Sequence, residues 1–255
     1  MFCVSRLYVS FYQIIVCVEG IDNRPKLSLM KVALADKPVL RQNLGRMKIL
    51  ALSDQVEERV YNLAGQGYFQ EIGLILGCGD LPYSYLEYLV SVLNVPMFYV
   101  PGNHDPENNP RFVSTRAEGG SNLDLKRARA KGLLLAGFGG SIRYHPGGIN
   151  QYSQAEAYGR VIRLIPGLLW NRIRYGRALD ILITHSPPFD IHDEKTQAHR
   201  GLKAINWILR WAQPRYHFHG HTHFFRRNLE PAVTQLGPTT IMNIFPYKLI
   251  EIKNV

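Results

Sequence analysis

Five apolar runs of the chain each end in side chains that can bind a metal ion or transfer a proton. The last run, Tyr216–His219, leads directly into Gly220-His221-Thr222-His223. Two histidines two residues apart can face one point only if the backbone leaves the strand there, and Gly220 permits that change of direction. The other four runs end, in chain order, in Asp54, in Asp80, in Asn103-His104-Asp105 and in His185.

Together these side chains offer carboxylate and amide oxygens and imidazole nitrogens. Divalent first-row metals such as Mn, Fe, Ni and Zn accept such mixed ligands, whereas Mg and Ca prefer oxygen alone. A carboxylate that lies between two ions can bridge them, and a pair of ions can activate a hydroxide while it holds a phosphoryl group. The residue types therefore favour metal-assisted hydrolysis of a phosphoester.

The elements that must position these residues alternate between strand and helix from Met47 onwards, which is the pattern of an α/β domain. The candidate ligands follow the predicted strands, at the carboxyl ends where open α/β sheets place their sites. An arginine-rich amphipathic segment, 155–177, is interrupted at Pro166-Gly167 and could lie on an anionic surface, cover the site, or pack on the core with a solvated basic face. We expect strands at 47–52, 72–76, 96–100, 133–137, 180–184 and, around Pro246, 239–252, and helices at 57–67, 84–93 and 199–212.

Length and composition narrow the class of protein. A chain of 255 residues suits one large domain, and its net charge of +10 favours anionic partners such as phosphates or nucleic acid. A basic surface without a dedicated partner is the alternative, and no motif of interleaved aromatic and basic residues supports a nuclease. Three cysteines without paired spacing favour a reducing cytoplasm. No run reaches the roughly 18 apolar residues of a membrane span.

Residues 1–46 lack the sustained periodicity of the rest of the chain. They precede Met47, where the first strand of the domain is expected to begin. We therefore predict an N-terminal extension over 1–46, either peripheral to a domain over 47–255 or upstream of its natural start. The alternative is an additional strand and helix that form part of the domain.

The strand-end motifs, taken in order, resemble those of the calcineurin-like metallophosphoesterases. The similarity implies an α/β/β/α fold, a sandwich of two mixed sheets flanked by helices, with two divalent ions at the sheet edges. It also implies hydrolysis of phosphomonoesters or phosphodiesters by a metal-bound hydroxide with a histidine as general acid. The similarity spans Met47 to about Ile252 and rests on Asp54, Gly79-Asp80, Gly102-Asn103-His104-Asp105, Thr184-His185-Ser186-Pro187-Pro188 and Gly220-His221-Thr222-His223.

The resemblance assigns metal ligands residue by residue. Asp80 would bridge two ions of the Mn, Fe, Ni or Zn type. Asp54 and His223 would hold the first ion. The second ion would be held by Asn103, His185 and His221.

The resemblance also assigns the proton donor. His104 would face the substrate and protonate the leaving oxygen, while Asp105 would orient the imidazole and raise its basicity. Further residues could contact the substrate: Arg143, His145, His199 and Arg200. For His199 and Arg200, capping the helix that follows is an equally good interpretation.

The first motif departs from the family pattern. That motif is usually Asp-x-His, whereas this chain reads Asp54-Gln55-Val56, so one imidazole of the first metal position is missing. We expect this position to bind more weakly, with water, Gln55 or Glu57 completing it. The alternative function is a scaffold that keeps the fold, has lost catalysis and binds a protein or an anionic partner. The intact second ligand set and the His104-Asp105 pair favour the enzyme.

Overall fold

The computed structural model describes residues 46–105, 116–223 and 233–253, and four short strands within the first 45 residues. The chain divides into two compact units, Met1–Leu44 and Gly45–Val255. All residues predicted to form the site lie in the second unit. In the first unit, two antiparallel pairs form: β1 (Tyr8–Ser10) with β2 (Gln13–Ile15), and β3 (Cys17–Glu19) with β4 (Pro25–Leu27).

One large sheet of the second unit has five strands, of which four run parallel. Helix α1 connects the first parallel strand to the second, and helix α2 connects the second to the third, as in successive βαβ units. The remaining strand, β17, pairs antiparallel with β5 at one edge. In spatial order the strands are β17 (Tyr247–Lys253), β5 (Arg46–Leu52), β6 (Ile72–Gly77), β7 (Met97–Tyr99) and β8 (Ser121–Asn122), and the helices are α1 (Glu58–Gly65) and α2 (Tyr83–Leu93).

The other large sheet has six strands, with a parallel centre and an antiparallel strand at each edge. In spatial order they are β15 (Val233–Leu236), β16 (Thr239–Asn243), β14 (Tyr216–His219), β13 (Ile181–Thr184), β10 (Leu133–Phe138) and β9 (Arg127–Ala130). The other elements of this half are the parallel pair β11 (Ser141–Ile142) and β12 (Gln151–Tyr152), and the helices α3 (Gln154–Ile162), α4 (Ile165–Tyr175) and α5 (Lys203–Ala212).

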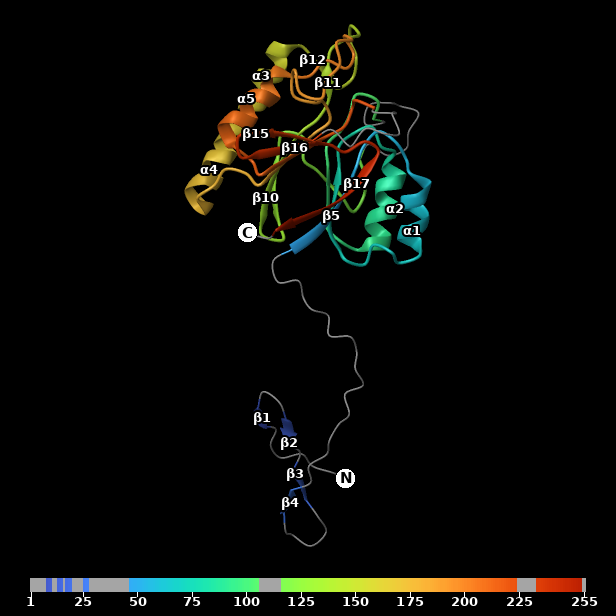
Figure 1. The fold of residues 1–255 in the computed structure, drawn as a ribbon, viewed down its shortest axis with the longest axis vertical. Coiled ribbons are helices and arrows are strands. Elements are labelled where there is room, and N and C mark those ends of the chain that lie inside the picture. Colours follow the sequence, from blue (N-terminus) through green and yellow to red (C-terminus); the bar gives the residue numbers. More distant parts are fainter. Residues whose placement is uncertain are drawn as a thin grey trace. The chain divides into compact units, whose positions relative to one another are not determined.

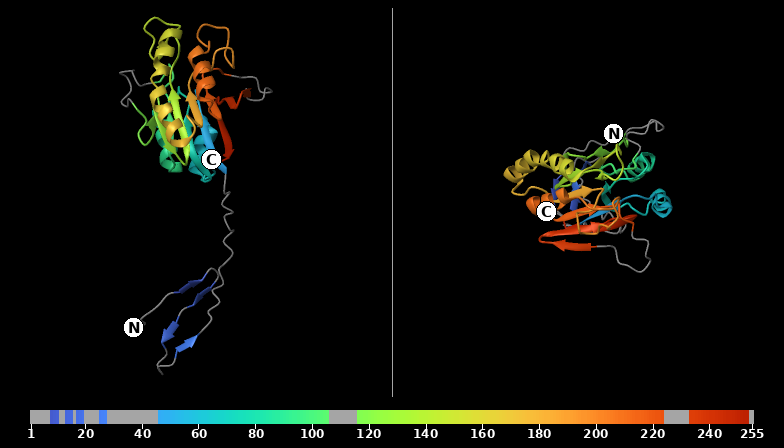
Figure 2. Two further views of the ribbon diagram at one scale, coloured as in Figure 1. Left: turned by 90° about the vertical axis from the view of Figure 1, so that its left-hand side faces the viewer. Right: turned by 90° about the horizontal axis from the view of Figure 1, so that it is seen from above.

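Apolar side chains pack in three layers that hold these elements together. Between the sheets lie side chains from both, including Leu74 of β6, Leu135 of β10 and Phe218 of β14. Helices α1 and α2 cover the outer face of the five-stranded sheet, and α3, α4 and α5 cover the outer face of the six-stranded sheet (Figures 1 and 2). The result is a two-sheet sandwich flanked by helices, which confirms the α/β/β/α fold class predicted from the sequence.

Two helices begin at positions other than those expected. Helix α2 begins at Tyr83, directly after Pro82, rather than at Ser84. Pro82 takes the N-cap position, where its missing N–H costs no hydrogen bond within the helix. Helix α5 begins at Lys203 rather than at His199. The residues before α5 form turns instead, so His199 does not cap this helix.

The arginine-rich segment forms α3 and α4, which pack on the core through Val161 and Leu168. The break falls before Pro166, which lies in the first turn of α4, where its missing N–H leaves no hydrogen bond unmade. Across the described ranges, no helix is both long and apolar enough to cross a membrane. Four large apolar side chains of this segment remain exposed: Ile162, Leu169, Trp170 and Ile173.

A deletion tests whether the first unit stabilises the second. We expect removal of residues 1–44 to change the melting temperature little, because β5 begins at Arg46 and, among the described residues, the three apolar layers are formed from Met47 onwards. Phe218→Ala serves as a destabilised control and should cost about 3–5 kcal/mol by opening a cavity between the sheets. Differential scanning calorimetry makes the comparison. A loss from the deletion as large as that from Phe218→Ala would mean that residues 1–44 belong to the domain.

Candidate metal centre

The predicted metal ligands lie at the carboxyl ends of strands from both sheets. Because parallel strands end at the same edge of a sheet, residues that follow them are brought together there. The two sheets therefore contribute ligands to one region. With the strand that each follows, the residues are Asp54 (β5), Asp80 (β6), Asn103 (β7), His185 (β13), and His221 and His223 (β14).

Three of these residues adopt the left-handed backbone conformation that side chains other than glycine rarely take. The φ angle is 64° at Asp54, 55° at Asp80 and 68° at His221. Each such position costs roughly 1–3 kcal/mol and persists only where its surroundings hold it, as they often do at functional sites. The chain therefore turns sharply just beyond three strands, at the cost of local strain.

Gly220 has a different role from the one expected. The left-handed residue of this turn is His221, whereas Gly220 is needed for a close approach. A Cβ atom at position 220 would lie 1.6 Å from Ser53 Oγ and 2.4 Å from Asp54 Oδ2. Glycine thus lets the loop after β14 lie directly against the loop after β5. In this arrangement the amide of His221 donates to Asp54 Oδ2 at 3.0 Å.

His185 is the buried centre of the second metal position. Its Nδ1 donates to the carbonyl oxygen of Cys78 at 2.9 Å, which turns Nε2 toward Asp80 Oδ2 at 3.3 Å and Asn103 Oδ1 at 3.0 Å. Burial lowers the pKa of His185, but the charges of Asp80 and Asp54 and the hydrogen bonds to Asp80 and to the Cys78 carbonyl together outweigh it and raise the pKa to about 10. Asp80 Oδ2, Asn103 Oδ1 and His185 Nε2 therefore face one point, and a proton or a metal cation at that point would stabilise them.

His221 completes this set as a neutral imidazole. Its Nε2 donates to the carbonyl oxygen of Ala198 at 2.7 Å, so Nδ1 remains free to bind a metal. Burial, reinforced by the charge of His185, lowers the pKa of His221 to about 3. The ligand atoms of Asp80, His185 and His221 lie within 4.8 Å of one another. This cluster fits a divalent cation.

Asp80 is ionised although it is largely buried. Burial raises the pKa of this carboxyl, but His185 and the amide of His104, which donates to Asp80 Oδ1 at 2.7 Å, bring the pKa down to about 2. Glycine is again required nearby, because a Cβ at Gly102 would lie 2.0 Å from Asp80 Oδ1. A permanent negative charge is therefore available at the second metal position.

Asp105 contacts backbone amides, whereas a contact with the imidazole of His104 was expected. The family resemblance implies that Asp105 orients His104, whereas its carboxylate accepts from the amides of Asp80 at 3.2 Å, Leu81 at 3.1 Å and Gly102. Burial and the charge of Asp80 raise the pKa of Asp105 to about 7. Asp105 therefore fixes the loop that carries Asp80 to the loop that carries His104.

The predicted first metal position contains fewer candidate ligands. His223 Nε2 lies 3.3 Å from Asp54 Oδ1, and this hydrogen bond raises the pKa of His223. Gln55 and Glu57, which were expected to complete the position, bond to each other: Gln55 Nε2 donates to Glu57 Oε1 at 3.1 Å. Val56, at the place of the missing histidine, is 39% exposed.

Tyr144 is a neighbour of the site that sequence reasoning missed. Its hydroxyl accepts from Asn103 Nδ2 at 3.1 Å and lies 3.4 Å from Nε2 of His104, whose side chain is exposed at the rim. Its two neighbours in the sequence, Arg143 and His145, were predicted as substrate contacts instead. Arg143 pairs with Glu156 at 2.8 Å, and the exposed His145 contacts Gln151 through its backbone amide. The only signal in the sequence was the position of Tyr144 between two candidates.

The remaining predicted substrate contacts lie on the loop before α5. The His199 ring is 5.3 Å from the His221 ring, and its Nδ1 lies 3.4 Å from Glu194 Oε2. The guanidinium of Arg200 lies over the Phe189 ring at 4.9 Å. His199 thus borders the metal centre, while Arg200 lines a separate cavity beside it.

A further layer of polar residues supports the loop after β14. Asn243 Nδ2 donates to the carbonyl oxygen and the hydroxyl of Thr222, at 2.9 and 2.8 Å, and so holds the residue between the two histidines. His192 Nδ1 lies 2.9 Å from His219 Nε2. The Asp190-Ile191-His192 segment is a turn with φ of 60° at Asp190 and 58° at His192, so its His192 supports β14 from a turn.

Comparisons with known proteins find relatives of low sequence identity. MJ1162 of Methanocaldococcus jannaschii, described as an uncharacterized protein, is 24% identical over 185 residues, which are 68% of this chain and 77% of that protein. The crystal structure of TT1561 of Thermus thermophilus has a TM-score of 0.53 and 17% identity, and the match covers 82% of this chain and 99% of that one. A Vps29 variant from Entamoeba histolytica gives a TM-score of 0.38 with 11% identity, covering 77% and 73%.

The family match spans the whole series of strand-end motifs. Residues 47–225, more than half of the chain, match the family described as calcineurin-like phosphoesterase. The matched range contains the carboxylates, the amide and the histidines at the sheet edges. The chain therefore belongs to the calcineurin-like phosphoesterase family.

Proposed function

We propose that this chain is a metal-dependent phosphoesterase that hydrolyses phosphomonoesters or phosphodiesters. The observation that carries the proposal is the convergence of Asp80, His185 and His221 within 4.8 Å, with Asn103 Oδ1 3.0 Å from His185 Nε2. This set mixes carboxylate and amide oxygens with two imidazoles. Such a mixture fits Mn, Fe, Ni or Zn better than Mg or Ca.

The two metal positions share one carboxylate in this proposal. Bound divalent ions would polarise the phosphoryl oxygens and supply a nucleophile at neutral pH. We assign Asp80 to both positions from the family motif in which it lies, and its charge raises the pKa of His185 of the second set and of His223 of the first. Asp54 and His223 would hold the first ion with fewer protein ligands, so that position is the weaker one.

His104 is the proposed proton donor. Its backbone amide is tied to Asp80 at 2.7 Å, while its ring is exposed beside the centre and 3.4 Å from the Tyr144 hydroxyl. A ring that is held at the metal site and open to solvent can protonate a leaving oxygen. Asp105 is a positioning residue, because it bonds to the amides of the Asp80 loop.

A scaffold is the second candidate function, and one observation favours it. Four large apolar side chains of α3 and α4 are exposed, with Ile173 at 80% and Trp170 at 56%. Such a group is a possible docking surface for a protein partner. Arg172 and Arg174 lie in the same helix and would suit an acidic partner. A scaffold would need neither the complete second ligand set nor the exposed His104.

The first test removes the shared carboxylate. Asp80→Asn should lower both metal content and turnover more than any other single ligand substitution, with a fall in turnover of at least about 100-fold, because the charge acting on both ions is lost. Asp190→Asn is a matched control at an exposed, left-handed aspartate. Elemental analysis and phosphoesterase assays are compared. Metal content and rates within about twofold of the parent would contradict the assignment.

The second test removes the proton donor. His104→Ala should keep the metal content and lower turnover by roughly 10²- to 10⁴-fold on esters with poor leaving groups. Nitrophenyl esters should lose less, since a nitrophenolate leaves without protonation. Steady-state kinetics on alkyl and nitrophenyl phosphates provide the comparison. Equal losses on both would exclude a proton-donor role for His104.

The third test supplies the missing imidazole. Val56→His should raise the metal content from about one toward about two ions per chain and increase activity at limiting metal, because an added ligand strengthens the first position. Val56→Ala is the control, since it removes the valine without adding a ligand. Metal titration followed by assay measures both effects. Unchanged metal content together with absent turnover in parent and variant would favour the scaffold.

A further inference from the structure

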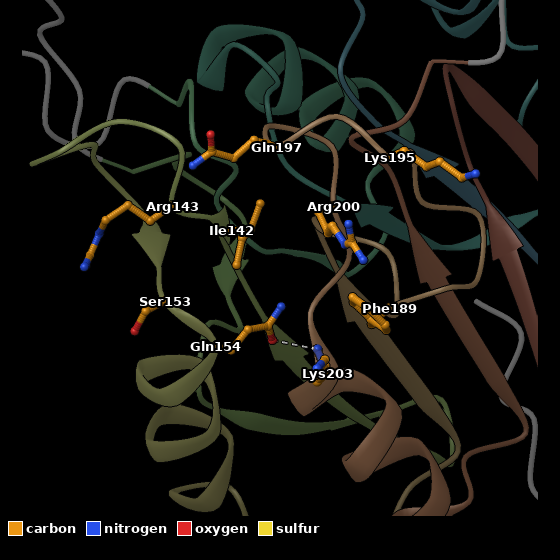
Figure 3. Close-up of a pocket in the computed structure, with 9 residues that line it drawn as sticks. All are labelled: Ile142, Arg143, Ser153, Gln154, Phe189, Lys195, Gln197, Arg200 and Lys203. Carbon is orange, nitrogen blue, oxygen red and sulfur yellow. Dashed lines mark hydrogen bonds between the residues drawn. The ribbon is translucent and has the colours of Figure 1, made fainter.

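A basic cavity lies beside the metal centre, between the starts of α3 and α5. Its volume is about 670 Å³. Four of its lining residues are basic, and none is acidic. Gln154 links the starts of α3 and α5 at this cavity, because its side chain accepts from the amide of Lys203 at 2.9 Å (Figure 3). It also donates to the carbonyl oxygen of Gly201 at 3.0 Å. The basic residues are Arg143, Lys195, Arg200 and Lys203.

Most of this positive charge is not neutralised. Among the described residues, no carboxylate forms an ion pair with Lys195, Arg200 or Lys203, whereas Arg143 pairs with Glu156 at 2.8 Å. Cations gathered without counter-charges repel one another, so an anion bound between them is favoured. The cavity is therefore suited to a ligand with a localised negative charge.

An aromatic ring holds two of the cations. Phe189 lies 4.9 Å from the Arg200 guanidinium and 4.8 Å from the Lys203 ammonium. Cation–π contacts of this kind fix the side chains without neutralising their charge. Because the ring is engaged by these cations, it is a support for the basic groups and not a free platform for stacking a nucleobase. This favours a small anion over a nucleic-acid strand.

The walls of the cavity continue into the metal centre. Gln197 lines the cavity and precedes Ala198, whose carbonyl oxygen accepts from His221 Nε2 at 2.7 Å. On the opposite wall, Arg143 precedes Tyr144, whose hydroxyl contacts Asn103 and His104. A ligand that fills the cavity thus lies next to the metal ligands and to the proposed proton donor.

We propose that the basic cavity binds a second phosphate group of the substrate, so that the preferred substrate is a small molecule with two phosphates, one hydrolysed at the metal centre and one held in the cavity. This inference rests on the proposed phosphoesterase function. The cavity volume lies within the roughly 300–1,000 Å³ of small-molecule sites. Guanidinium and ammonium groups, which Arg200 and Lys203 supply, are the usual protein partners of phosphate.

The experiment compares substrates that differ in one phosphate. Suitable pairs are adenosine 3′,5′-bisphosphate with adenosine 5′-monophosphate, and fructose 1,6-bisphosphate with fructose 6-phosphate. For at least one pair, kcat/KM of the parent should be about tenfold or more higher for the bisphosphate, mainly through KM, because charge-assisted hydrogen bonds contribute on that scale. In Arg200→Gln/Lys203→Gln this ratio should fall by about tenfold.

A charge-matched control separates the cavity from the general positive field. Arg172→Gln/Arg210→Gln removes the same charge from exposed sites on α4 and α5 outside the cavity and should keep the parental ratio. Ratios near one for every pair in the parent, or equal ratios in the parent and the cavity variant, would overturn the proposal. Tighter binding of an oligonucleotide than of any bisphosphate would overturn the assignment to a small substrate.

A binding titration keeps this test independent of the proposed activity. If the parent hydrolyses neither these compounds nor nitrophenyl phosphate, the phosphoesterase proposal fails, and calorimetry with inorganic pyrophosphate then tests the cavity alone. The Kd for pyrophosphate should rise by about tenfold in Arg200→Gln/Lys203→Gln and stay unchanged in the charge-matched control. An equal Kd in the parent and the cavity variant would overturn the anion site.

Discussion

Burying the carboxylate of Asp80 where two sheets meet is unfavourable unless positive charge lies beside it. His185 provides that charge when its ring carries a second proton, and a divalent cation would provide it more strongly. The surrounding contacts all serve this arrangement: the amide of His104 donates to Asp80, Gly102 leaves room for its oxygen, and Asp105 holds the loop by its amides. The centre is therefore built around one ionised side chain.

The sandwich makes this arrangement possible because each sheet supplies part of the centre. Asp80 follows a strand of one sheet, and His185 and His221 follow strands of the other, so the apolar layer between the sheets sets the distance between the ligands. At Gly220 the loop after β14 lies directly against the loop after β5, and the amide of His221 donates a hydrogen bond to Asp54. These contacts hold the two sheet edges together. Packing between the sheets therefore determines the geometry of the site, and a cavity between the sheets would disturb both.

The sequence was sufficient to predict what periodicity and spacing encode. Apolar runs that end in Asp54, Asp80 and His185 identified the strands and the edge where they converge, and the order of the motifs identified the family and its fold. The sequence alone could not predict contacts between residues that lie far apart in the chain. Tyr144 meets His104 through a loop of no recognisable motif, and the partners of Asp105 are backbone amides, which no residue type reveals. The start of α5 was missed because hydrogen bonds from Gln154 and from the amide of Leu202 to Pro187 hold the residues before it in a non-helical conformation.

The central claim is that the convergence of Asp80, His185 and His221 is a working metal site, and metal dependence tests it most directly. We expect the purified protein to carry between about one and two first-row divalent ions per chain. A chelator should remove both the ions and the hydrolysis of nitrophenyl phosphate, and Mn or Zn should restore them while the fold stays intact. Hydrolysis that survives complete removal of metal, or a folded protein that binds no divalent ion at all, would contradict it.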